Sequence, residues 1–167
     1  EETPITEIAD IISKDPALAA QILKVANSAF YGLSQNVGNL ERAIVILGLR
    51  EIKNIIFMMS VIRLFPQDLS PVFSKAKFLK HSIYTAHTAE TLAKALKQNF
   101  KSSPFLAGLL HDIGKIFLEQ NFHQAYSSIC QKTQQEKQPY QILEKRILGI
   151  DHAEIGGIIA ASWNFPP

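Results

Sequence analysis

An adjacent histidine and aspartate, His111 and Asp112, are the residues of this chain best suited to chemistry. An imidazole nitrogen and a carboxylate oxygen can together ligate a divalent metal ion. Residues four apart are neighbours on a helix, so Lys115 is expected on the same face as His111, where its ammonium group could hold a phosphate against the metal. The alternative is a hydrogen-bonded His-Asp pair inside an apolar helix that binds no metal, because short motifs are weak evidence for a site.

Two further histidines could complete such a site. His81 precedes His111 by 30 positions, and His152 follows Asp151, which is expected to cap a helix. The positive end of a helix dipole favours the neutral form of an imidazole, and this is the form that ligates metals. The alternative for each is a structural histidine that donates to a backbone carbonyl. The remaining histidines of interest are expected on the surface: His87 and His123.

The elements that position these residues are predicted to be helices throughout. Hydrophobic residues recur at spacings of three and four along nearly the whole chain, which is typical of an all-α fold. Asp15 and Pro16 predict one helix start, as an N-cap followed by proline at the first helical position. Gly48 is predicted to end another helix, and Gly114 lies inside the helix of the His-Asp pair at a cost of about 1 kcal/mol. Helices are predicted over 5–12, 16–27, 40–47, 52–62, 71–96, 104–120, 126–134, 140–148 and 152–161.

Composition limits the class of protein. The 167 residues suit a single domain, with two helical subdomains separated by a soft boundary near 66–71, and both ends suggest a piece of a longer protein. A net charge of +2 gives no sign of a nucleic-acid or membrane-surface protein. No apolar run reaches the roughly 18 residues of a transmembrane helix. The single cysteine, Cys130, is compatible with a cytoplasmic location, since it cannot form an internal disulfide.

Several stretches resemble a known superfamily. His81, His111-Asp112 with Gly114-Lys115, and 152–156 are similar to the motifs of the HD superfamily of metal-dependent phosphohydrolases. The last of them resembles a stretch of the HD-GYP cyclic-di-GMP phosphodiesterases. The segments 15–32 and 40–49 more specifically resemble the signature of HDOD domains, which are HD-related output modules of bacterial signalling proteins. This resemblance covers nearly the whole chain.

The resemblance implies a helical HD-like bundle with a regulatory or scaffolding role that acts through contacts with a signalling protein. It also implies metal ligands for Fe, Mn, Zn or Mg at His81, His111, Asp112 and His152, with Lys115 as a phosphate contact. No aspartate that would close the ligand set of an active HD enzyme follows His152, and the Gly-Tyr-Pro signature is missing. We therefore expect a regulatory module with a retained but incomplete site. The alternative is a metal-dependent phosphohydrolase of the HD superfamily, such as a phosphodiesterase that acts on a cyclic nucleotide.

Two other binding modes follow from the N-terminal half. The segment 6–27 has the outline of a helix-turn-helix, but Gln21 and Lys24 are the only long polar side chains of its second helix, so DNA binding is not favoured. Phe30 and Tyr31 lie between predicted helices, where exposed aromatic residues would favour a protein interface. The alternative is that both rings pin the loop to the core.

Overall fold

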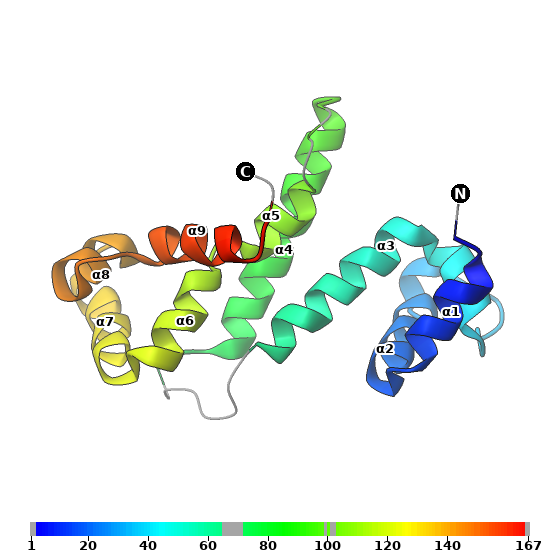
Figure 1. The fold of residues 1–167 in the computed structure, drawn as a ribbon, viewed down its shortest axis with the longest axis horizontal. Coiled ribbons are helices and arrows are strands. Elements are labelled where there is room, and N and C mark those ends of the chain that lie inside the picture. The colour runs from blue at the N-terminus through cyan, green and yellow to red at the C-terminus, as the bar shows by residue number, and fades with distance from the viewer. Residues whose placement is uncertain (1–2, 65–71, 99, 101–102, 166–167) are drawn as a thin grey trace. The chain divides into compact units, whose positions relative to one another are not determined.

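The computed structural model describes residues 3–64, 72–98, 100 and 103–165, and all of the regular elements in that part of the chain are helices (Figure 1). The all-α prediction is confirmed. In chain order they are α1 (Ile5–Ser13), α2 (Pro16–Ala26), the short 3-10 helix η1 (Ala29–Tyr31), α3 (Leu40–Arg63), α4 (Lys75–Ala95), α5 (Pro104–Leu110), α6 (Ile113–Asn121), α7 (His123–Glu136), α8 (Tyr140–Leu148) and α9 (His152–Ser162). None of the described helices is long and apolar enough to cross a membrane.

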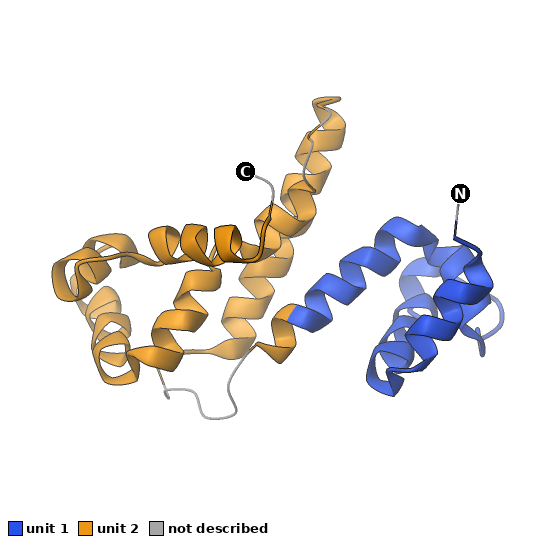
Figure 2. Cartoon of the chain, viewed as in Figure 1, with its two compact units in different colours: residues 1–60 blue, residues 61–167 orange. Residues whose placement is uncertain are grey.

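The chain divides into two compact units, residues 1–60 and 61–167 (Figure 2). The subdomain boundary expected near 66–71 lies outside the described residues. Unit 1 has a core of apolar side chains from α1, α2 and α3, among them Ile22, Ile44 and Ile55, which are almost wholly buried. Unit 2 has a separate core of side chains from α6 to α9.

Local signals in unit 1 act as the sequence predicts. The Asp15 carboxylate accepts the backbone N–H of Leu18 at 3.1 Å, and Pro16 is the first residue of α2. The continuous assignment of α3 contains an interruption at Gly48, where φ is 77° and ψ is 155°. A side chain is disfavoured at that positive φ, so glycine is the residue that permits the break between the two predicted helices.

In unit 2 the long helix α4 begins at Lys75, where the Ser74 hydroxyl accepts the N–H of Lys77, and not near 71 as predicted. The prediction of one helix over 104–120 is wrong. α5 ends at Leu110, α6 begins at Ile113, and Asp112 between them has a non-helical φ of −106° and ψ of 11°. The His-Asp pair therefore lies at a break between two helices.

Two glycines explain why the chain changes direction at this break. A Cβ on Gly108 would lie 2.7 Å from the Cα of Ala86, so α5 packs backbone-to-backbone on α4. A Cβ on Gly114 would collide with the carbonyl of His152, so α6 packs against the backbone of α9 even more closely. A single straight helix would have to meet both partners along one axis. The break lets each half follow its own partner, and it leaves the residues between them facing both α4 and α9.

Candidate metal centre

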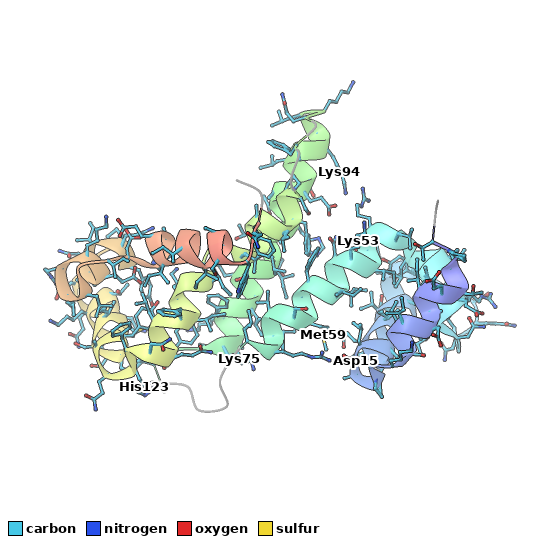
Figure 3. The ribbon with its side chains drawn as sticks, in the orientation of Figure 1. Asp15, Lys53, Met59, Lys75, Lys94 and His123 are labelled. Atoms are coloured by element: carbon cyan, nitrogen blue, oxygen red, sulfur yellow. The ribbon has the colours of Figure 1, made fainter. Side chains whose placement is uncertain are left out.

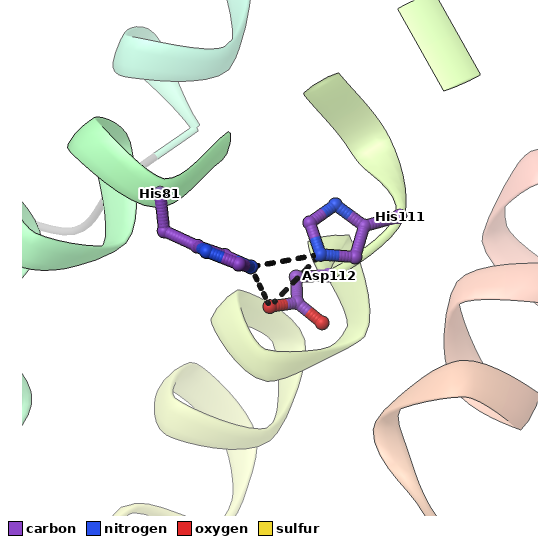
Figure 4. Close-up of side chains that lie close together, drawn as sticks. All are labelled: His81, His111 and Asp112. Atoms are coloured by element: carbon purple, nitrogen blue, oxygen red, sulfur yellow. Dashed lines mark hydrogen bonds and ion pairs between the residues drawn. The ribbon is translucent and has the colours of Figure 1, made fainter. Parts of the chain in front are cut away.

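Three of the predicted ligands converge on one point. His81 comes from α4, while His111 and Asp112 occupy the break between α5 and α6 (Figure 4). His81 Nε2 lies 3.1 Å from His111 Nε2 and 3.6 Å from Asp112 Oδ2, and His111 Nε2 lies 3.3 Å from the same oxygen. Within the described residues these form the group of three His, Cys, Asp or Glu side chains whose donor atoms all lie within 4.8 Å of one another.

These separations match the size of a coordinated ion. Two donors that each lie 2.0–2.2 Å from one ion are about 3.0 Å apart at a right angle and about 3.4 Å apart at a tetrahedral angle. His111 Nδ1 lies 2.8 Å from the Gly108 carbonyl, which can only accept, so Nδ1 carries a proton. In the neutral ring Nε2 then has a free lone pair for an ion, whereas without an ion a protonated Nε2 can donate to Asp112. The two imidazoles and the carboxylate therefore fit a single divalent ion.

Asp112 is the centre of a wider polar cluster. Its side chain is buried, and Lys115 Nζ donates to Oδ2 at 2.7 Å. Burial would raise the pKa of Asp112, but hydrogen bonds from His111, His152 and Lys115 outweigh it and hold that pKa far below the usual range. The hydrogen bond to Asp112 is also the main reason that the pKa of His111 is raised. Lys115 was predicted to lie on the same helix face as His111. The helix break instead places Lys115 against Asp112.

His152 approaches the opposite side of the same carboxylate. Its Nε2 lies 3.3 Å from Asp112 Oδ1, so the structure brings it to the cluster but not into the group of three donors around Oδ2. Burial alone would lower the pKa of His152, but hydrogen bonds to the carboxylates of Asp112 and Glu144 raise it to about 9. The helix dipole was expected to keep this imidazole neutral. Without a metal that expectation is wrong, because two carboxylates outweigh a partial backbone charge.

Glu144 is the residue that sequence reasoning missed. It is fully buried on α8, and its Oε2 accepts both the backbone N–H of His152 at 2.9 Å and its Nδ1–H at 2.5 Å. A signal was present, because Tyr140, Glu144 and Leu148 are four apart and fall on the buried face of one helix. A carboxylate on such a face needs a buried partner.

The two histidines expected outside the site lie there. Both His87 and His123 are exposed. The His87 ring packs edge-on against Phe105, with ring centroids 5.1 Å apart. His123, at the start of α7 (Figure 3), places Nδ1 2.9 Å from a Glu119 carboxylate oxygen.

A cavity of about 360 Å³ adjoins the centre, with His111 in its wall. Small and apolar side chains of α5 and α9 form most of its lining, together with Trp163 and Phe165. No lysine or arginine is among the described residues that line it. An anionic ligand would therefore find few partners in this cavity beyond the centre itself.

Comparison with known proteins identifies the family. A family model described as "HDOD domain" matches residues 1–167. The chain belongs to the HDOD family. The resemblance carried by the segments 15–32 and 40–49 is thereby confirmed.

Solved structures share the fold of this HDOD domain. An HDOD domain protein of unknown function from Geobacter sulfurreducens is 27% identical with a TM-score of 0.84, and the match covers 99% of this chain and 55% of the other. A protein from Shewanella amazonensis, named as a candidate phosphohydrolase, is 29% identical with a TM-score of 0.78 and coverages of 100% and 58%. One from Marinobacter aquaeolei, named as a candidate signal transduction protein, is 25% identical with a TM-score of 0.79 and coverages of 99% and 38%. The chain spans 32% and 26% of the lengths of two curated relatives.

Proposed function

We propose that this HDOD domain is a regulatory module of bacterial signalling, located in the cytoplasm, that acts through protein contacts and holds one divalent ion at His81, His111 and Asp112. The convergence of three donor atoms at separations of 3.1 to 3.6 Å carries this proposal. A two-metal hydrolytic site would need a second set of ligands, and the described residues offer no second group of three. His152 faces Asp112 Oδ1, so it contacts a ligand of the first site and does not begin a second one.

The ion would be Zn or Fe in preference to Mn or Mg, because imidazole nitrogens suit the first two, whereas oxygen ligands suit Mn and Mg. When bound, a metal of this kind can polarise a phosphoryl oxygen and lower the pKa of its water. In a regulatory module the three ligands need only hold the ion, which then links the helices that carry them. His81 belongs to α4, while His111 and Asp112 join α5 to α6, so three ligands on one ion tie these helices together.

The partner surface is proposed to include the loop after α2. Phe30 is 88% exposed and meets Tyr31 edge-on, with ring centroids 5.1 Å apart. Its ring therefore does not pin the loop to the core. The base of the loop is closed instead by Asn27, whose side-chain amide donates to the Val37 carbonyl at 3.0 Å and accepts the Val37 N–H at 2.7 Å. An aromatic side chain on a braced loop is a typical anchor for a protein partner.

Turnover assays test the regulatory assignment. We expect no appreciable hydrolysis of cyclic-di-GMP or simple phosphate esters when Mn²⁺, Fe²⁺ or Mg²⁺ is supplied. Metal-dependent turnover that disappears in the His111→Ala, Asp112→Ala double variant would overturn the regulatory assignment.

That outcome would favour a second candidate function, a metal-dependent phosphohydrolase. One observation supports it. Lys115 Nζ lies 2.7 Å from Asp112 Oδ2, the oxygen that faces His81 and His111, so its ammonium group could bind a phosphate beside the metal position. A Lys115→Met variant separates the two functions. With the metal at saturation, an enzyme would lose affinity for its phosphate substrate, whereas a regulatory module would keep its partner.

A further inference from the structure

Glu144 is the most deeply buried charged group near the metal centre, and its hydrogen bonds go to none of the three proposed ligands, His81, His111 and Asp112. Its side chain is fully buried within unit 2. The buried carboxylate must be compensated by strong hydrogen bonds, since an apolar residue of similar volume would fill the same space at lower cost. In the described part of the chain, both hydrogen bonds that its carboxylate accepts come from a single residue, His152.

These two bonds fix His152 in two respects. The bond from the backbone N–H at 2.9 Å sets the position of the first turn of α9, and the bond from Nδ1 at 2.5 Å sets the rotation of the ring. With Nδ1 turned toward α8, the opposite nitrogen Nε2 is directed at Asp112 Oδ1, 3.3 Å away. The capping box of α9 joins Asp151 and Glu154 and does not reach the ring.

The consequence for Asp112 is an oriented carboxylate. His152 engages Oδ1 on one side, while Lys115 engages Oδ2 on the other at 2.7 Å. Oδ2 is the oxygen that faces His81 and His111. If the carboxylate rotated, Oδ2 would leave the point where the two Nε2 atoms converge, and the ion would lose one of its three ligands.

We propose that Glu144 is a positioning residue of the metal centre: it holds the His152 ring, which in turn orients the Asp112 carboxylate for the ion. The inference rests on the proposed function in one respect, namely that His81, His111 and Asp112 bind a metal. Mutation of a residue that hydrogen-bonds a metal ligand typically weakens metal binding 10- to 100-fold. Close packing supports the arrangement, because Gly114 leaves room for the His152 carbonyl against α6.

The test measures Zn²⁺ affinity of the whole chain by competition with a chelator dye. Glu144→Leu preserves volume without a hydrogen-bond acceptor, and we expect it to weaken Zn²⁺ binding by about 10-fold, the lower end of the range for partners that contact a ligand directly, since Glu144 acts through His152. Glu144→Gln keeps an acceptor oxygen and should restore most of the affinity. Two variants serve as controls: Leu143→Ala removes an equally buried neighbour on α8, and Glu154→Gln disturbs the start of α9 without touching the His152 ring. Both should bind Zn²⁺ like the wild type.

A double-mutant cycle separates positioning from general destabilisation. In a His152→Ala background, Glu144→Leu should cause no further loss of Zn²⁺ affinity, because its effect passes through the missing ring. Wild-type affinity in a folded Glu144→Leu variant, or full additivity in the cycle, would overturn the proposal. Should Glu144→Leu fail to fold, Glu144→Ala takes its place in the same cycle.

Nitrogen-15 spectra of the histidine rings in metal-free protein distinguish the two levels of failure. If the wild type binds no Zn²⁺, the metal function fails. The positioning link is then judged by the ring of His111, which contacts Asp112. A shift of the His111 signals in Glu144→Leu but not in Glu154→Gln supports the link from Glu144 to Asp112. Unchanged His111 signals in Glu144→Leu refute it.

Discussion

The two compact units bury different kinds of side chain. In the described part of unit 1, Asn54 is the single buried polar residue, and the rest of the buried set is apolar. The described part of unit 2 buries six polar residues: Ser82, Asp112, Glu119, Glu144, Asp151 and His152. Burying charge is costly unless it is paired, so a fold stabilised by hydrophobic packing alone would not bury so many carboxylates. The difference supports the proposal that unit 2 holds the ion, while unit 1 supplies structure and a partner surface.

The largest effect is expected from the apolar core of unit 1. Ile22 is fully buried, so Ile22→Ala should lower the free energy of unfolding by about 2–5 kcal/mol through lost packing and the cavity left behind. Ile22→Val is the graded control and should cost about 0.5–1.5 kcal/mol. Urea denaturation followed by circular dichroism measures both. Zn²⁺ affinity should not change in either folded variant, and a clear change would contradict the division of roles between the units.

A smaller effect is expected at the polar centre of unit 2. Asp112→Asn leaves Lys115 and His152 facing a neutral amide, so metal-free protein should lose about 1–3 kcal/mol of stability. Asp10→Asn is the matched control, because Asp10 forms an exposed pair with Lys14 worth at most about 1 kcal/mol. Thermal melts with and without a chelator give the answer. A chelator-sensitive wild type beside an equally stable, chelator-insensitive Asp112→Asn would mean that the centre contributes stability only through its ion.

The smallest effect concerns the cap of α9. The Asp151 carboxylate accepts the N–H groups of Ala153 and Glu154, so Asp151→Ala should cost about 1 kcal/mol and Asp151→Ser much less. Hydrogen bonding from the Glu154 backbone lowers the pKa of Asp151. Its contribution is therefore present above the unfolded-state pKa of about 4 and lost as the pH falls through the lower folded value. The stability difference between wild type and Asp151→Ala should shrink in acid, and a difference that grows would contradict this account.

Local signals were enough to predict most of the helices. The cap at Asp15 and the break at Gly48 each depend on one or two residues and their neighbours, and both predictions are confirmed. The break at His111 and Asp112 was missed because the sequence there carries an unbroken helical pattern of apolar residues. The cause lies in distant contacts, where Gly108 meets α4 and Gly114 meets α9. No local propensity encodes them.

The site divides in the same way. Adjacent residues and a family resemblance were sufficient to select His81, His111 and Asp112, and the structure places their donor atoms together. The role of His152 depends on which oxygen of Asp112 it meets, and Glu144 depends on how α8 packs against the start of α9. Both depend on tertiary contacts, which the sequence pattern does not show. The charge of His152 follows from them, because the two carboxylates outweigh the effect of the helix dipole.

One measurement tests the central claim most directly: anomalous diffraction from crystals of the Zn²⁺-loaded chain. The account predicts one peak per chain, within about 2.0–2.2 Å of His81 Nε2, His111 Nε2 and Asp112 Oδ2. It also predicts that His152 remains on Asp112 Oδ1 and outside the coordination shell. Absence of a peak at these three atoms, or a second ion ligated by His152, would contradict it.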